Sequence, residues 1–159
     1  MAVRDLIGKR GESIVVTRLM DFCGRRFPYF DPHPLGEKCP TFDFLVELVD
    51  AGRSAPYFLV QAKATQRSST GGEFPLKMSL GRPDVQRMIG CPIPTYLIGV
   101  DEQAEAAYIV SIHGNVKGSI SSIPTRYPLN CQNLQSLWDE VRTFWQTLDP
   151  SARTSIFAL

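Results

Sequence analysis

Four side chains that could do chemistry together come from three separate stretches of the sequence: Glu12, Asp43, Gln61 and Lys63. Glu12 falls on the apolar stripe of a predicted helix, so its carboxylate is expected to point toward the body of the protein and to meet a cation or a hydrogen-bond donor there. Asp43, Gln61 and Lys63 fall on two neighbouring predicted strands. Two carboxylates, an amide and an ammonium group in one place predict either a salt-bridged cluster or a reactive site.

The two strands that carry Asp43, Gln61 and Lys63 are predicted to form a hairpin, and its register decides which of these residues face each other. A turn near Arg53 sets Asp43 opposite Lys63, whereas a shift by two residues keeps the same faces and sets Asp43 opposite Gln61. In both registers the groups fall within about 4.5–8 Å of one another. On its own, the hairpin is explained equally well by a cross-strand salt bridge on a solvated face.

Hydrophobic periodicity predicts the elements that must hold these groups in place. A helix over residues 3–22 ends near Gly24, and the Pro-rich stretch 27–34 permits at most a short edge strand. The rest of the order is strand, strand, strand, helix, strand, strand, helix, over residues 41–50, 57–65, 74–80, 83–89, 95–100, 106–113 and about 131–149. Residues 119–131 are expected to be largely irregular. This mixed order predicts an α/β fold in a single domain over residues 1–159.

The composition excludes several broad classes of protein. Of the 159 residues, 43% are hydrophobic and 21% charged, which is ordinary for a globular domain, and the net charge of +1 gives no global attraction to nucleic acid or membrane. No apolar stretch is long enough to span a membrane, and the N-terminus lacks a secretory signal, so no membrane partner is expected. The cysteines lie far apart without a CxxC pair, which favours a reduced, soluble, cytoplasmic protein without a disulfide framework or zinc site: Cys23, Cys39, Cys91 and Cys131.

The order of the four polar residues resembles the PD-(D/E)XK nuclease superfamily. The matching segments are GKRGE at residues 8–12, FDFLV at 42–46 and FLVQAK at 58–63, followed by PIPTYLIGVD at 92–101. The match is closest to an uncharacterised bacterial group with a GxxGE helix and a Q-x-K strand, and it covers residues 5–113. It implies a restriction-endonuclease-like αβββαβ core over about residues 3–113, with a mixed central sheet flanked by helices and a C-terminal helix over about 131–149.

The resemblance also implies a chemistry, namely metal-dependent hydrolysis of DNA phosphodiester bonds by an endonuclease. Mg²⁺ or Mn²⁺ would be held by Glu12, Asp43, the side-chain oxygen of Gln61 and the carbonyl of Ala62. Lys63 would orient the attacking water and stabilise charge on the phosphate. Further contacts to DNA phosphates are expected from four residues near this site, with residues 68–72 as a flap: Lys9, Arg10, Thr65 and Arg67.

One departure from the family pattern keeps other interpretations open. The family most often has an acidic residue at the position of Gln61, so an amide there removes a negative charge and should lower metal affinity. Glu47, on the same strand face as Asp43, is a further candidate carboxylate. The alternative function is therefore a catalytically inactive nuclease-fold module for nucleic-acid binding or protein assembly, and a third interpretation is an unrelated α/β protein. The resemblance also allows a homodimer, since cutting both strands needs two sites, and a larger partner protein.

Overall fold

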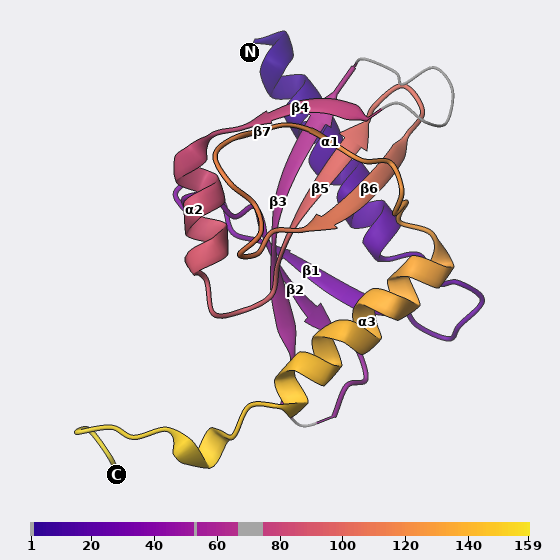
Figure 1. Ribbon diagram of the computed structural model, residues 1–159. Helices are drawn as coiled ribbons and strands as arrows, with labels where there is room; N and C mark the ends of the chain where they lie inside the picture. The colour runs from indigo at the N-terminus through magenta and orange to yellow at the C-terminus, as the bar shows by residue number, and fades with distance from the viewer. Residues whose placement is uncertain (1, 53, 67–74) are drawn as a thin grey trace.

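The computed structural model describes residues 2–52, 54–66 and 75–159, which form a mixed α/β fold (Figure 1). The described elements follow the chain in this order: α1 (Val3–Leu19), β1 (Phe30–Pro34), β2 (Phe44–Leu48), β3 (Tyr57–Thr65), β4 (Leu76–Leu80), α2 (Arg82–Gly90), β5 (Thr95–Asp101), β6 (Ala106–Ser111), β7 (Ile120–Ile123), α3 (Cys131–Gln146) and the short 3₁₀ helix η1 (Pro150–Ala152). The α/β class and the predicted order of helices and long strands are confirmed. The expectation that residues 119–131 lack a strand is wrong, because β7 lies within them.

The main sheet is mixed, and its two central strands are parallel. Its order is β1-β2-β3-β5-β6, in which β3 and β5 run parallel and every other neighbouring pair is antiparallel. The Pro-rich segment forms β1 at the edge of the sheet, where proline costs few ladder hydrogen bonds. A separate antiparallel pair, β4 with β7, lies over the main sheet. The chain therefore brings β3, the strand with Gln61 and Lys63, to the middle of the fold.

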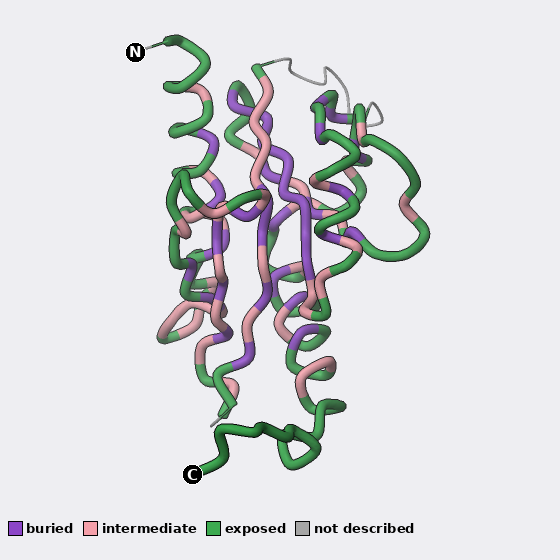
Figure 2. Tube along the Cα trace, turned by 90° about the vertical axis from the view of Figure 1, so that its left-hand side faces the viewer, coloured by how far each residue is buried: buried purple, intermediate pink, exposed green. Residues whose placement is uncertain are grey.

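Two hydrophobic cores form on the two faces of the main sheet, and β5 contributes to both. Tyr96, Ile98 and Val100 pack with α1 and α3, whereas Leu97 packs with α2, β4 and β7. Gly99 permits the second sheet to approach β5, because a Cβ atom there would overlap the Met78 side chain. Figure 2 shows the buried strands in the middle of the molecule and exposed residues on the outer sides of the helices. The resulting frame encloses β3 from both faces.

The buried face of α1 differs in part from the predicted stripe. Its buried residues are Gly11, Val15 and Leu19; Val15 and Leu19 belong to the predicted stripe, whereas Gly11 is buried in place of Glu12. Glu12 is consequently exposed rather than buried, although it borders the buried face. The helix ends at Leu19 rather than near residue 22, and Cys23 and Gly24 then take left-handed backbone conformations, with φ values of 51° and 71°.

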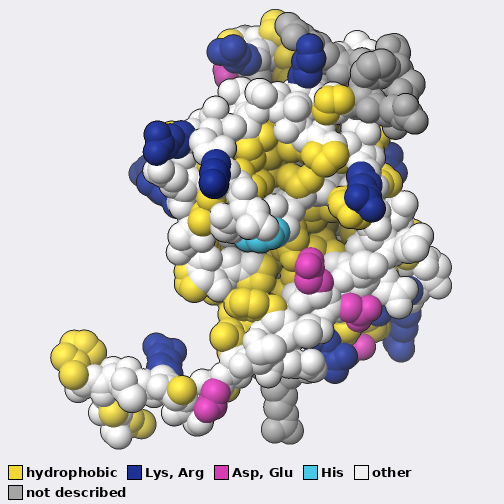
Figure 3. Space-filling view, viewed as in Figure 1, with side chains coloured by type: hydrophobic (Ala, Val, Ile, Leu, Met, Phe, Trp, Pro, Cys, Tyr) yellow, Lys and Arg dark blue, Asp and Glu magenta, His cyan; other side chains and the backbone are white. Residues whose placement is uncertain are grey.

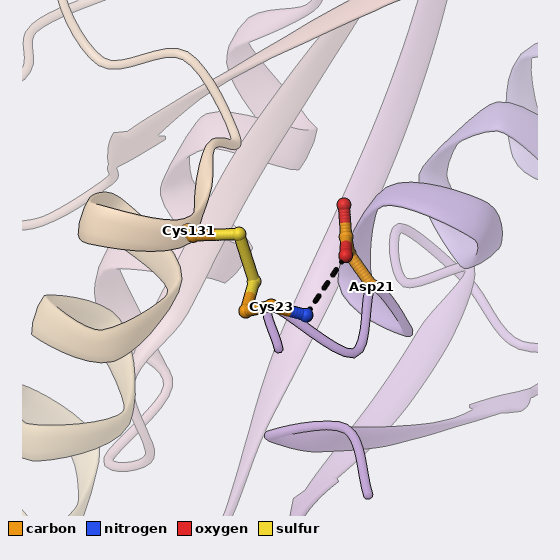
Figure 4. A group of neighbouring side chains, drawn as sticks. All are labelled: Asp21, Cys23 and Cys131. Carbon is orange, nitrogen blue, oxygen red and sulfur yellow. Dashed lines mark hydrogen bonds between the residues drawn. A yellow bond between two sulfur atoms is a disulfide. The ribbon is translucent and has the colours of Figure 1, made fainter. Parts of the chain in front are cut away.

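A disulfide joins Cys23, which follows α1, to Cys131, the first residue of α3 (Figure 4). The expectation of reduced cysteines is wrong for this pair, because a sequence separation of 108 residues gives no sign that the two thiols meet in space. Asp21 lies beside the bridge, and its carboxylate accepts a hydrogen bond from the Cys23 backbone N–H at 2.9 Å. Cys39 and Cys91 are free thiols. The disulfide ties together the two helices that cover one face of the sheet.

The last helix is held to the strand ends by its two tryptophans. The indole N–H of Trp138 donates to the carbonyl of Val49, and that of Trp145 donates to the carbonyl of Tyr57, at 3.0 and 2.8 Å.

Beyond α3 the chain forms an exposed C-terminal arm that carries Ile156 and Phe157 (Figure 1). Among the described residues, no helix is both long and apolar enough to cross a membrane.

Candidate active site

A cleft of about 620 Å³ opens at the end of β3, between α1 and β4. The five residues predicted to bind the metal or to act in catalysis all line it: Glu12, Asp43, Gln61, Ala62 and Lys63. They come from α1, from the residue preceding β2, and from β3, so segments far apart in the sequence meet at one place. The arrangement brings two carboxylates, an amide, a backbone carbonyl and an ammonium group to a single opening.

The cleft exists because β2 and β3 separate near this point. Pairing between the strands reaches Phe44 opposite Val60, and the remainder of β3 pairs with β5 alone. Asp43 therefore lies across from Gln61, which is the second of the two predicted registers. Its backbone N–H donates to the Val60 carbonyl at 2.8 Å. Beyond this point the Asp43 side chain, instead of the backbone of β2, accepts hydrogen bonds from β3.

The Asp43 carboxylate is bound by two donors from β3. Its Oδ2 accepts hydrogen bonds from the Ala62 backbone N–H at 2.7 Å and from the Gln61 side-chain Nε2 at 2.8 Å. The same Gln61 nitrogen donates to the Ala62 carbonyl at 3.1 Å. Gln61 is only 6% exposed, so this amide is buried and held between two oxygens. The side chains of Asp43 and Gln61 thus have a fixed relative position at the floor of the cleft.

Both carboxyl groups at the cleft have a raised pKa. For Glu12 the causes are partial burial, then the charges of Asp43 and Glu37, with Lys9 acting in the opposite direction. For Asp43 burial also raises the pKa, while the Ala62 N–H and the charge of Lys63 oppose the shift. Burial is thus the main cause at both carboxyl groups, and the charge of Asp43 adds to it at Glu12. A cation bound between the two carboxyl groups would favour their charged forms.

Two glycines of α1 line the wall of the cleft, and packing requires glycine at only one of them, Gly11. A Cβ atom on Gly11 would lie 2.5 Å from the Cβ of Ala64, so only glycine permits this close approach of α1 to β3. A Cβ atom on Gly8 would meet no atom within 4 Å, and Gly8 lines the cleft without such a contact. The residue after Gly11 is Glu12, and the close approach therefore brings its carboxylate to the edge of the site.

Two basic residues that were not predicted to belong to the site line the same cleft, Arg4 and Lys77. Arg4 lies eight residues before Glu12, and the helical spacing of Arg4, Ile7, Gly8, Gly11 and Glu12 puts them all on the cleft side of α1. That spacing was a usable signal for Arg4. Lys77 lies on β4, where it alternates with the buried Leu76 and Met78. No pattern in the sequence connects β4 with the cleft, because the second sheet reaches it through tertiary packing.

The predicted nucleic-acid contacts are not all gathered at the cleft. Arg10 is held on another side of α1, where Nη2 donates to Glu105 Oε1 at 2.7 Å and Nη1 donates to the Glu102 carbonyl at 2.9 Å. Lys9 lines a neighbouring hollow that shares Glu12 with the cleft. Thr65 lines the cleft itself. Arg67 and the predicted flap at residues 68–72 lie outside the described residues.

Glu47 is not a ligand candidate at this site. It pairs in register with Asp31 and with Tyr57, at the other end of β2 from Asp43. Its carboxylate oxygen lies 3.6 Å from Nε2 of His33. Although Glu47 was predicted on the same strand face as Asp43, it lies too far along β2 to reach the cleft.

The donor atoms at the cleft fit a hard divalent cation in their chemistry, since they offer carboxylate, amide and carbonyl oxygens. The raised pKa values of Glu12 and Asp43 agree with this, because both groups are partly removed from water and a bound cation would stabilise their charged forms. The Gln61 nitrogen, however, lies between Asp43 Oδ2 and the Ala62 carbonyl, two oxygens expected to hold the ion. A cation bound by both oxygens requires the Gln61 amide nitrogen to leave the space between them, and the Gln61 side-chain oxygen could then face the cation.

A second hollow lies between β6 and α3 and holds none of the predicted site residues. It is lined mainly by apolar groups, including Ile109, Tyr127 and Leu137, and Figure 3 shows this hydrophobic surface above α3. Within it the Tyr96 hydroxyl donates to Glu140 at 2.7 Å. Burial and this neighbouring carboxylate raise the pKa of Tyr96 well above its usual range.

In comparisons with known proteins, the chain matched no family model, no curated protein and no solved structure.

Proposed function

We propose that this protein is a metal-dependent endonuclease that hydrolyses DNA phosphodiester bonds on a restriction-endonuclease-like αβββαβ core. The observation that supports this most is the meeting of Glu12, Asp43, Gln61, the Ala62 carbonyl and Lys63 at one cleft. These groups come from three segments and include two carboxyl groups with raised pKa values. A salt bridge on a solvated sheet face does not account for them, because Lys63 makes no ion pair within 4.0 Å in the described part of the chain.

Each residue has a role that follows from its chemistry. When bound, Mg²⁺ or Mn²⁺ would polarise the scissile phosphate and lower the pKa of a bound water. Asp43 and the Ala62 carbonyl would hold the ion, and Glu12 would add a carboxylate from the α1 wall. Lys63, a compact charge with rotatable donors, would neutralise charge developing on the phosphate and position the attacking water.

The test is nicking of supercoiled and linear duplex DNA and of single-stranded DNA with Mg²⁺ or Mn²⁺, compared with EDTA. We expect metal-dependent cleavage by the wild-type protein and a loss of at least about a hundredfold in Asp43→Ala and Lys63→Ala. Asp139→Ala and Lys117→Ala are matched controls, because both residues are exposed and lie outside the cleft. Unchanged cleavage in Asp43→Ala or Lys63→Ala would show that the site is wrong.

One observation favours a second function, a nuclease-fold module that binds nucleic acid or another protein without catalysis. The Gln61 amide already spans Asp43 and the Ala62 carbonyl, so it satisfies oxygens that a metal would otherwise need. Calorimetry with MnCl₂ separates the two functions. Heat of binding that disappears in Asp43→Ala supports the enzyme, whereas no binding of Mn²⁺ together with retained binding of DNA supports the module.

A further inference from the structure

The basic residues around α1 fall into two groups with different surroundings. Arg10 and Arg18 are bound to the turn after β5, where Arg18 Nη2 donates to the Glu105 carbonyl at 2.7 Å and Arg10 forms the bonds described above. Arg4 and Lys77 make no hydrogen bond and no ion pair within the described residues. The first pair therefore has a structural role, whereas the second pair keeps its charges available for a ligand.

Arg4 and Lys77 stand on opposite walls of the cleft. Arg4 lies in the first turn of α1, on the side of the helix that also carries Glu12, and Lys77 projects from the exposed side of β4. Lys63 comes from β3, the strand at the floor of the same cleft. Figure 1 shows the N-terminal part of α1 and β4 at the same end of the main sheet. Three cations thus surround one opening from three different elements.

The distribution of charge at this opening indicates the kind of ligand. Its described lining carries Arg4, Lys63 and Lys77 against Glu12 and Asp43, whereas the chain as a whole is nearly neutral. Arg and Lys side chains are common partners of the phosphate oxygens of nucleic acids, so cations on separate walls fit a ligand with several phosphates in a row. We infer that Arg4 and Lys77 bind the backbone phosphates that flank the phosphate at Lys63 on a DNA strand. This inference rests on the proposed function.

The consequence is a measurable dependence of binding on salt. Each phosphate neutralised by a cation adds about 0.9 to the slope of log K against log salt for duplex DNA, and about 0.7 for a single strand. Arg4→Ala and Lys77→Ala are therefore each expected to lower the slope by about that amount, and the double variant by about twice as much. Lys77→Arg is expected to keep the wild-type slope.

The experiment measures fluorescence anisotropy of a labelled DNA duplex, and of one of its strands alone, over a series of KCl concentrations in EDTA, so that no cleavage occurs. Arg87→Ala and Lys117→Ala are matched controls, because both residues are exposed and outside the cleft. Slopes that fall in Arg4→Ala and Lys77→Ala, but not in these controls, support the inference. Slopes that stay unchanged, slopes that fall equally in the controls, or a wild-type protein that binds neither DNA would overturn it.

This outcome is independent of the nicking test for the proposed function. If Asp43→Ala abolishes nicking while the slopes of Arg4→Ala and Lys77→Ala equal the wild-type value, the nuclease assignment stands and the phosphate contacts are wrong. If no metal supports nicking while the slopes fall as expected, the two basic residues bind DNA in a protein without hydrolytic activity.

Discussion

The side-chain nitrogen of Gln61 lies 2.8 Å from Oδ2 of Asp43 and donates a hydrogen bond to it. The same nitrogen lies 3.1 Å from the Ala62 carbonyl oxygen. A partially positive N–H group therefore occupies the space between two oxygens that would otherwise repel each other. In electrostatic terms, the Gln61 amide is a weak substitute for a cation at this position, and metal binding has to compete with it.

Replacing Gln61 with glutamate is expected to strengthen metal binding. The variant removes the competing N–H donors and adds a negative charge, and both changes favour a divalent cation. We expect the affinity for Mn²⁺ to rise by at least about tenfold, which is about 1.4 kcal/mol. Isothermal titration calorimetry with MnCl₂ measures this. The matched control is Gln86→Glu, an equal change of charge at an exposed position on α2, outside the cleft. Equal or weaker binding by Gln61→Glu would contradict the assignment of the ion to this position.

The raised pKa of Glu12 makes the metal-free protein less stable at neutral pH than it would be with a neutral side chain. The folded state keeps the Glu12 proton to a higher pH than the unfolded chain does, so the free energy of unfolding falls as the pH rises above the ordinary value of 4.5. Glu12→Gln removes this effect. It should therefore raise stability at neutral pH, by less than about 1 kcal/mol because the side chain is exposed to solvent.

Urea unfolding at a series of pH values in EDTA checks this sign. The gain in Glu12→Gln should be present at neutral pH and should disappear below about pH 4.5, where the carboxyl is protonated in both states. Asp139→Asn, at an exposed position on α3 away from the cleft, controls for the change in net charge. A variant that is less stable than wild type at neutral pH would show that Glu12 ionises favourably in the fold.

Local patterns in the sequence were sufficient for most of the elements, but not for their contacts. The alternation along β3 and the helical period of α3 are properties of neighbouring residues, and both elements lie where they were predicted. The Cys23–Cys131 bridge and the arrival of Lys77 at the cleft depend on how distant elements pack, and no local pattern carries that information. β7 is only four residues long and pairs with β4 across a distant connection, so its period was too short to recognise.

In the candidate site, too, local patterns predicted some features, whereas the packing of distant elements decided others. Asp43 and Gln61 were predicted to be neighbours because a hairpin has few registers, and the structure has one of the two that were considered. Glu12 lies at the cleft beside the other predicted ligands, but the expectation that its side chain is buried is wrong. Gly11, and not Glu12, faces Ala64, and this leaves the Glu12 carboxylate at the edge of the cleft.

The contact between Gly11 and Ala64 predicts opposite effects for two similar substitutions on one helix. Alanine at position 8 meets no atom within 4 Å, so Gly8→Ala should raise the free energy of unfolding by about 0.5–1 kcal/mol through helix propensity. Alanine at position 11 meets the Ala64 Cβ at 2.5 Å, so Gly11→Ala should lower it by about 1–3 kcal/mol and move α1 away from β3. Urea unfolding of both variants tests this. Equal effects of the two substitutions would show that α1 does not pack on β3 at Gly11.

The Cys23–Cys131 disulfide is expected to supply a large share of the stability under oxidising conditions. It closes a loop of 108 residues, and cross-links of this kind typically add about 2–4 kcal/mol to the free energy of unfolding, mainly by restricting the unfolded chain. Cys131→Ser should lose this amount in the absence of a reductant and should resemble the reduced wild-type protein in its presence. Cys91→Ser is the control, because Cys91 is a free thiol of intermediate exposure. Thiol titration of the unfolded, non-reduced protein should find two free thiols, and a result of four would mean that the bridge does not form.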